Sequence, residues 1–138
     1  MTVLVDTSAW IALLTRNDQH HPAALAIQAR LRQKRVKLLT TDYIVDETVT
    51  WLRYRVGHAA TVAFWETTLR SALIEIAPIH RDLLEAAWGI FKKYADQELS
   101  LTDYTSFALM RDRNLKRAFT FDRHFLYVGF EILPFPST

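Results

Sequence analysis

The chain of 138 residues contains no cysteine. Disulfides and thiolate metal sites are therefore excluded, and a cytoplasmic location is the simplest expectation. Glycine and proline are also scarce, with 3 and 4 residues, which argues against disorder and against a repeat of short turns. No apolar run approaches the roughly 18 residues that a membrane span needs. The apolar N-terminal stretch has no basic leader and contains Asp6, so we expect neither a signal peptide nor membrane association.

What the chain does contain indicates one globular domain over residues 1–138. Half of the residues are hydrophobic, and 4 Trp, 5 Tyr and 8 Phe supply large side chains for a core. A chain of this length buries roughly two thirds of its unfolded surface. No linker, repeat or low-complexity tract divides it. The net charge of +2 permits a nucleic-acid partner without requiring one.

Hydrophobic periodicity predicts strands that alternate with helices. The expected strands are Thr2–Asp6, Val36–Thr41, Ala72–Ile79, Arg117–Phe121 and Phe130–Phe135. The expected helices run from Thr7 or Ser8 to Leu14, from Ala23 into the basic segment 30–37, around Ile44–Leu52, and over Ala59–Leu69, Leu83–Tyr94 and Thr102–Asp112, with a loop at Asn17–His21. Such alternation predicts parallel βαβ units with right-handed crossovers, and hence an α/β fold.

Four acidic residues lie where a parallel sheet places its ligand site. Asp6 and Asp122 lie at the carboxyl ends of two expected strands. Asp103 lies in the first turn of a helix, and Glu47 lies about one turn into the helix after the second strand. Ligands bind outside the carboxyl ends of the strands in open parallel sheets. We therefore expect the four side chains to converge on one edge of the sheet.

Each acid taken alone also has an ordinary structural explanation. Asp6 suits a turn, and Asp122 suits a short cap. Asp103 follows Ser100 at the spacing of a capping box. Glu47 suits a solvated helix face. These explanations stay open for each residue by itself.

Taken together, the four acids favour a metal site. Two carboxylates about 4 Å apart repel by about 4 kcal/mol at an effective dielectric constant near 20. A hard cation such as Mg²⁺ or Mn²⁺ relieves that repulsion and prefers oxygen ligands. Setting the four aside leaves 11 acidic residues (15 less four) against 17 basic ones, which suits a polyanionic substrate. The basic residues cluster in segments 30–37 and 111–117 and at Arg53 and Arg55, where solvated helix ends are the alternative to phosphate contacts.

Four motifs in order resemble the PIN domain ribonucleases, and among these the VapC toxins of bacterial and archaeal toxin–antitoxin pairs. The motifs are VDTSAWIALL, TDYIVDETVTWL, LSLTDYTSFALM and AFTFDRHF. The resemblance spans Val3 to about Pro134. It implies a three-layer α/β/α sandwich with a central parallel sheet, and a Mg²⁺- or Mn²⁺-dependent endoribonuclease.

The resemblance also implies the roles of particular residues. The family's four catalytic and metal-binding acids fall on Asp6, Glu47, Asp103 and Asp122, and its neighbouring hydroxyl residues fall on Thr7, Ser8, Thr102 and Thr120. The implied products carry a 5′-phosphate and a 3′-hydroxyl. Asp42, Asp46 and Asp96 are interpreted as capping or surface residues. No histidine is required as a base, although His124 could approach the site.

The partners that the resemblance implies are a cognate VapB-like antitoxin, an RNA substrate and a second copy of the chain. Promoter DNA is expected to be bound only through the antitoxin. Trp10, Trp51, Trp65 and the pair Leu13–Leu14 are candidates for a groove that takes an antitoxin helix, with core packing as the alternative.

Two other functions compete with the nuclease. An aspartyl-phosphate phosphatase needs a second acid two residues after its nucleophile, and Ser8 stands there. A non-catalytic nucleic-acid- or protein-binding module needs no acid cluster, and neutralising Asp6 or Asp103 would leave its function intact.

Overall fold

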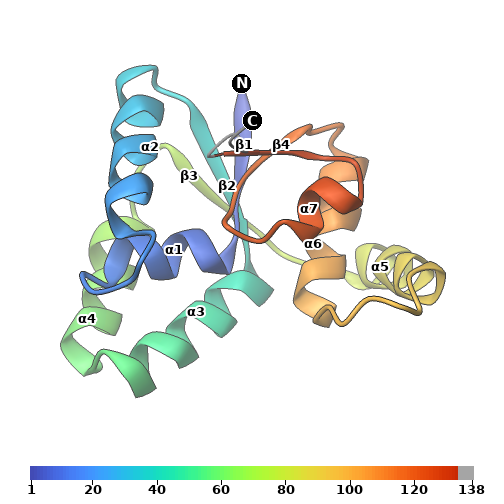
Figure 1. Ribbon diagram of the computed structural model, residues 1–138, viewed down its shortest axis with the longest axis horizontal. Coiled ribbons are helices and arrows are strands. Elements are labelled where there is room, and N and C mark those ends of the chain that lie inside the picture. Colours follow the sequence, from blue (N-terminus) through green and yellow to red (C-terminus); the bar gives the residue numbers. More distant parts are fainter. Residues whose placement is uncertain (134–138) are drawn as a thin grey trace.

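A central sheet of five parallel strands organises the chain (Figure 1). The computed structural model describes residues 1–133. The strands are β1 (Thr2–Val5), β2 (Lys37–Thr41), β3 (Ile74–Ala77), β4 (Arg117–Phe119) and β5 (Glu131–Leu133). They lie in the order β3-β2-β1-β4-β5, and every neighbouring pair is parallel. The predicted α/β class and parallel sheet are confirmed.

Helices cover both faces of this sheet. They are α1 (Thr7–Leu14), α2 (His21–Gln33), α3 (Asp42–Arg55), α4 (His58–Ala63), α5 (Arg81–Lys93), α6 (Leu101–Asp112) and α7 (His124–Tyr127), with a π-helical turn η1 (Phe64–Thr68) after α4. Figure 1 shows α1 and α2 on one side of the strands and α6 and α7 on the other, which gives three layers. Among residues 1–133, no helix has the length and apolar character needed to cross a membrane.

The position of β1 in the sheet decides where a site can form. β1 pairs with β2 on one side and with β4 on the other. The chain builds the sheet outward from β1 in one direction through β2 and β3, and then in the other through β4 and β5. The gap between β1 and β4 is therefore the topological switch point, beyond whose carboxyl ends ligands bind in such folds. Asp6 leaves β1 at this point, and its N–H donates to the Phe119 carbonyl of β4 at 3.0 Å.

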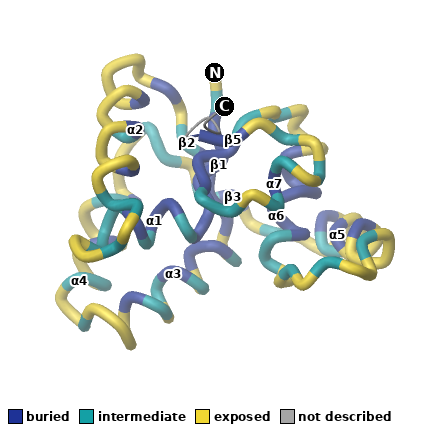
Figure 2. The backbone as a smooth tube through the Cα atoms, viewed as in Figure 1, coloured by how far each residue is buried: buried dark blue, intermediate teal, exposed yellow. Residues whose placement is uncertain are grey.

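The core is centred on β1 and α6, the two elements with long runs of buried residues. Val3, Leu4 and Val5 are fully buried, as expected of a central parallel strand covered on both faces. Residues 104–110 of α6 are all buried as well, because α6 lies between the sheet and α5. Figure 2 shows burial concentrated on the strands and on α6, and exposure on the outer turns of α2, α4 and α5.

The predicted strands are longer than the observed ones. The third strand shrinks from Ala72–Ile79 to Ile74–Ala77, and the fourth ends at Phe119 rather than Phe121. Beyond Phe119 the chain bends, and this bend aims Asp122 at the site. The last expected strand is present as Glu131–Leu133, while Pro134 and Phe135 lie outside the described residues.

Helical boundaries also differ from the prediction, and one short helix is additional. The helix expected over Ala59–Leu69 begins at His58 and widens into the π-helical turn at Phe64. α2 begins at His21, one residue before Pro22, inside the predicted loop. The short helix α7 was not predicted, because four residues carry too little periodicity to be recognised.

Candidate active site

Asp6 lies at the centre of the candidate site, directly after β1. Its Oδ2 accepts hydrogen bonds from Ser8 Oγ at 3.1 Å and from Thr120 Oγ1 at 2.9 Å. Its side chain is buried, with 3% of the residue exposed, and its Oδ1 has no hydrogen-bond partner among the described residues. A buried carboxylate oxygen without a donor is costly, so this atom is in position for a ligand.

Ser8 and Thr120 tie the ends of β1 and β4 together. Thr120 Oγ1 accepts from the Asp122 N–H, and Ser8 Oγ accepts from the Phe121 N–H, both at 3.0 Å. Each hydroxyl thus donates a hydrogen bond to Asp6 and accepts one from a backbone N–H of the segment that follows β4. The two hydroxyls fix the rotamer of Asp6 and the path of the chain that carries Asp122.

Asp103 serves the start of α6 and the acid cluster at once. Its Oδ2 accepts from the Ser100 N–H, and its own N–H donates to Ser100 Oγ, both at 3.2 Å. The capping box expected from the sequence is therefore present. The same carboxylate lies close enough to Asp6, Asp122 and Glu47 to interact electrostatically with each. Capping and membership of the cluster are compatible.

Asp122 is held by a histidine. Its Oδ1 accepts from the His124 N–H at 2.9 Å, and His124 Nδ1 lies 2.6 Å away, so the Nδ1–H tautomer donates to it as well. His124, which the sequence showed only as able to approach the site, therefore contacts one of its acids. The contact occupies one oxygen of Asp122 and leaves Oδ2 for another partner.

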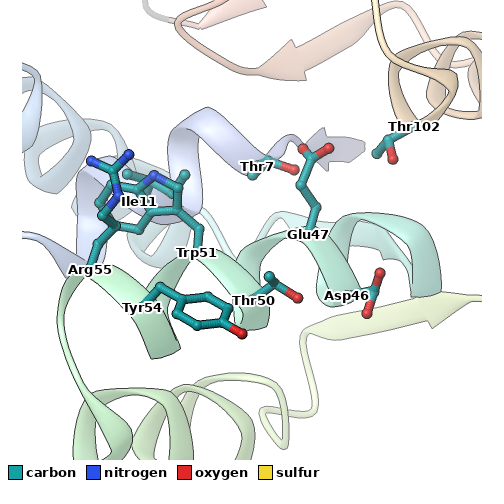
Figure 3. A pocket seen from close by; sticks show the side chains of 9 residues that line it. All are labelled: Thr7, Ile11, Asp46, Glu47, Thr50, Trp51, Tyr54, Arg55 and Thr102. Carbon is teal, nitrogen blue, oxygen red and sulfur yellow. The ribbon is translucent and has the colours of Figure 1, made fainter.

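Glu47 and two threonines form the wall opposite Asp122. Glu47, Thr7 and Thr102 line a cleft of about 550 Å³ that extends along α3. Figure 3 shows the Glu47 carboxylate pointing towards Thr7 and Thr102. Thr7 Oγ1 is buried and has no hydrogen-bond partner among residues 1–133, so it too is available to a ligand.

Burial and the neighbouring charges raise the pKa values of Asp6 and Asp103. Burial, and next the charge of Asp103, raise the pKa of Asp6 from 3.8 to about 7. Burial, and next the charge of Asp122, raise the pKa of Asp103 from 3.8 to about 6, with a smaller contribution from Glu47. Perturbed carboxylates of this kind are typical of functional sites, because folding alone gives no reason to gather them.

The donor set fits a hard divalent cation. Carboxylate and hydroxyl oxygens are the ligands that Mg²⁺ and Mn²⁺ prefer, and Asp6 Oδ1 faces the cluster without a donor. In the described part of the chain, no three His, Asp or Glu side chains already surround a single ion position. Hydrogen bonds from Ser100 to Asp103 and from His124 to Asp122 each engage one oxygen of these two acids. Bridging waters or small side-chain rotations would complete such a shell.

Several other predicted roles are settled by the structure. Asp42 accepts from the Tyr43 and Ile79 N–H groups, each at 3.0 Å, so it is a capping residue as interpreted. Asp46 is exposed at the cleft rim. His20 stacks on Phe121 with ring centroids 4.4 Å apart, and His21 Nδ1 lies 2.7 Å from the Ala12 carbonyl oxygen.

Core packing, the alternative to an antitoxin groove, describes most of the residues considered for that groove. Trp10 is fully buried, and Leu13 and Leu14 pack against the core. Trp65 is half exposed, but it does not line the cleft beside Glu47. Trp51 alone among these residues lines that cleft.

Sequence reasoning missed two features of the site. One is the contact between Asp122 and His124, which depends on the bend after β4. The other is the cleft along α3, where Trp51, Tyr54 and Arg55 follow Glu47 at intervals of four, seven and eight residues. That spacing places them on one face of the helix and could have been recognised as a stripe.

Comparison with known proteins places the chain in a family. The pattern that defines the PIN domain matches residues 3–131. The chain is 35% identical over 133 residues to the 23S rRNA-specific endonuclease VapC20 of Mycobacterium tuberculosis, covering 96% of this chain and 98% of that one. It is 28% identical over 118 residues to a VapC ribonuclease of Archaeoglobus fulgidus, covering 84% and 74%.

Solved structures agree with this assignment. The crystal structure of Mycobacterium tuberculosis VapC20, described as a sarcin-ricin loop cleaving toxin, superposes with a TM-score of 0.82 at 34% identity, over 93% of this chain and 95% of that one. DNA-bound VapBC from Salmonella typhimurium shares the fold with a TM-score of 0.72 at 13% identity, over 96% of each chain. With its motifs, its sheet order and these relatives, the chain belongs to the PIN domain family.

Proposed function

We propose that this chain is a metal-dependent endoribonuclease and the toxin component of a type II toxin–antitoxin pair. The observation that carries the proposal is Asp6, a buried carboxylate with an unpartnered oxygen beside Asp103 and Asp122. The named activity of the 35% identical relative supports RNA as the substrate. A non-catalytic module would gain nothing from this arrangement, which costs stability.

In the proposed mechanism, Asp6, Asp103, Asp122 and Glu47 hold Mg²⁺, for which Mn²⁺ can substitute. When bound, the ion supplies acidified water and positive charge for the phosphoryl oxygens. Ser8 and Thr120 keep Asp6 Oδ1 directed into the site by holding Oδ2. Thr7 and Thr102 offer hydroxyls on the Glu47 side, where they can orient water or phosphate.

The bond changes follow from hydrolysis of a phosphodiester. Water oxygen attacks phosphorus in line with the departing 3′ oxygen, the P–O3′ bond breaks, and the 3′ oxygen takes up a proton. The products are a 5′-phosphate and a 3′-hydroxyl. The raised pKa values of Asp6 and Asp103 belong to the metal-free cluster, and binding of the ion would displace protons from both carboxylates.

The first test is RNA cleavage by the purified chain without any antitoxin. Total cellular RNA is incubated with Mg²⁺ or Mn²⁺, and the ends of any fragments are mapped. We expect discrete cleavage that is lost with a chelator and in Asp103→Asn, and retained in Asp82→Asn, an exposed acid on α5. Intact RNA with both metals, from a folded protein, would contradict the proposal, as would full activity of Asp103→Asn.

We further propose that a VapB-like antitoxin silences the chain, that the toxin is a homodimer, and that promoter DNA is bound only through the antitoxin. Support comes from neighbours of the same fold that were solved as VapBC assemblies, some with DNA. Light scattering at micromolar concentration tests the dimer, and a monomer mass would contradict it. Loss of RNA cleavage on adding the co-purified antitoxin tests the silencing.

A further inference from the structure

Two clefts of the surface each contain one acid of the cluster, Glu47 in one and Asp122 in the other. The first, of about 550 Å³, begins at Thr7, Glu47 and Thr102 and continues along α3. The second, of about 570 Å³, begins at Asp122 and His124 and continues along α7. Both are of the size that holds a small ligand or a nucleotide. The mechanism described above uses only their inner ends.

The outer ends of the two clefts carry the same two kinds of side chain. Tyr54 and Arg55 line the first cleft, and Arg123 and Tyr127 line the second. Figure 3 shows Tyr54, Arg55 and Trp51 extending from α3 at the end away from Thr102. Each cleft therefore leads from a carboxylate to an aromatic ring and a guanidinium.

These rings and cations contribute little to folding, although the Tyr127 ring lies edge-on to Tyr94 with centroids 6.3 Å apart. Tyr54 is 83% exposed and Tyr127 is 61% exposed, so neither contributes its full apolar area to the core. Arg55 and Arg123 form no salt bridge within residues 1–133, although carboxylates line both clefts. Exposed rings alternating with unpaired cations are typical of surfaces that bind single-stranded nucleic acid, where bases stack on the rings and phosphates approach the cations.

We propose that the two clefts seat the nucleotides on either side of the cleaved phosphate of an unpaired RNA strand, with Tyr54 and Tyr127 as stacking surfaces and Arg55 and Arg123 as phosphate contacts. This inference rests on the proposed nuclease function and adds the residues that hold the strand beside the cleaved phosphate. An intact RNA helix hides its base faces and offers a major groove too deep and narrow for side chains, so these tyrosines select an unpaired loop or end.

The geometry along α3 agrees with a strand that leaves the site. Glu47, Trp51 and Arg55 follow one another at four-residue intervals on one face of the helix. Eight residues of helix span about 12 Å, so the guanidinium is anchored two turns away from the acids. A phosphate next along the strand can reach it without displacing the phosphate at the acid cluster.

Binding is measured in the inactive Asp103→Asn background with a labelled mixed-sequence oligoribonucleotide, alone and annealed to its complement. We expect Tyr54→Ala and Tyr127→Ala each to weaken binding of the unpaired strand about tenfold, in line with the loss of one stacked base. Tyr54→Phe and Tyr127→Phe, which keep the ring, should stay within about twofold. Arg55→Gln and Arg123→Gln should each lower the salt dependence of binding by about one phosphate contact.

Controls outside the clefts are Trp65→Ala, a half-exposed aromatic, and Arg70→Gln, an exposed cation. Neither should change binding, and melting temperatures confirm that every variant folds. The tyrosine variants are also assayed for cleavage on the otherwise native chain, where we expect a higher KM with less change in kcat.

The outcomes separate this inference from the proposed function. If the native chain cleaves RNA while all four cleft substitutions leave binding unchanged, the clefts do not seat the strand. Equal affinity for the duplex, or loss of antitoxin binding without loss of RNA binding, also overturns the inference. If RNA binds through these residues but no metal supports cleavage, the nuclease proposal fails and the RNA-binding surface stands.

Discussion

At the residue scale, the site is built from side chains that carry two roles. Asp103 caps α6 and belongs to the acid cluster, and Thr120 positions both Asp6 and Asp122. Such sharing explains why each acid, read alone from the sequence, also has a purely structural explanation. The structural explanation of Asp103 is correct, and it does not compete with a role in the site.

Asp6→Asn should stabilise the metal-free protein above pH 7. The folded state raises the pKa of Asp6 from 3.8 to about 7, so it binds the proton more tightly than the unfolded chain. Asp6 therefore costs the native protein up to about 4 kcal/mol of stability as pH rises from about 4 to about 7, and the variant lacks this loss while keeping the smaller one due to Asp103. Urea unfolding with a chelator at several pH values measures the difference, which should vanish below pH 4. A difference independent of pH would contradict this explanation.

Thr120→Val should impair both stability and RNA cleavage. Valine keeps the shape but removes the donor to Asp6 Oδ2 and the acceptor for the Asp122 N–H. Thr120 is fully buried, so water cannot replace these bonds, and the loss is about 1–3 kcal/mol. Thr120→Ser, which retains the hydroxyl, is the matched control and should keep most of the activity. Similar behaviour of the two variants in thermal melts and cleavage assays would argue against the hydroxyl's role.

Much of the site, but not all of it, follows from residue types and spacing. The four acids could be named as candidate site residues because two of them follow apolar strands and the other two lie early in helices. The contact between His124 and Asp122 could not, because it depends on the bend that ends β4 at Phe119. Nor could the exposure of Tyr54, since helical periodicity gives the face of a residue but not what covers that face.

At the element scale, the sequence specifies the presence of helices and strands better than their ends. Alternating apolar runs predict the five strands, yet three of these end early where the sheet stops offering partners. The π-helical turn at Phe64–Thr68 buries Phe64 against Trp10, with ring centroids 5.4 Å apart. Tertiary packing of this kind overrides the local helical pattern, so the π-helical turn cannot be predicted from the residues of the segment alone.

Substitution by alanine should change the stability of the protein in opposite directions at two glycines. Gly57, before α4, has φ of +140°, and Gly89 lies inside α5, while an added Cβ meets nothing within 4 Å at either position. Gly57→Ala should therefore lower stability by about 1–3 kcal/mol through backbone strain alone. Gly89→Ala should raise it by about 0.5–1 kcal/mol through helix propensity. Urea unfolding of the two variants tests this, and a shared sign would refute the backbone argument.

At the scale of the whole molecule, strand order gathers the acids. The alternation of strands and helices predicts a parallel sheet, but it does not fix the order β3-β2-β1-β4-β5, which depends on which strands pair. Only that order makes β1 and β4 neighbours and brings Asp6 beside Asp122. The family resemblance, rather than periodicity, is what allowed the three-layer arrangement to be expected.

Divalent cations should stabilise the whole protein in a pH-dependent way. An ion that binds only the folded state raises the melting temperature. By mass action, it adds about 2.7 kcal/mol to the free energy of unfolding when its concentration is one hundred times its dissociation constant. Protons compete for Asp6 and Asp103, whose pKa values are about 7 and about 6. Thermal melts with Mg²⁺ or Mn²⁺ should therefore show a larger shift at pH 8 than at pH 5. The shift should disappear in Asp103→Asn and persist in Asp82→Asn; an equal shift in both would place the ion elsewhere.

The pairing of β1 with β4 has a consequence for the ribosome that makes the chain. Asp6 is among the first residues synthesised, while Phe119, which anchors it, and Asp122 are among the last. Until β4 has left the ribosome and paired with β1, Asp122 cannot join Asp6, Glu47 and Asp103. A nascent chain that ends before β4 therefore has an incomplete site, and the four acids come together only when synthesis is nearly finished.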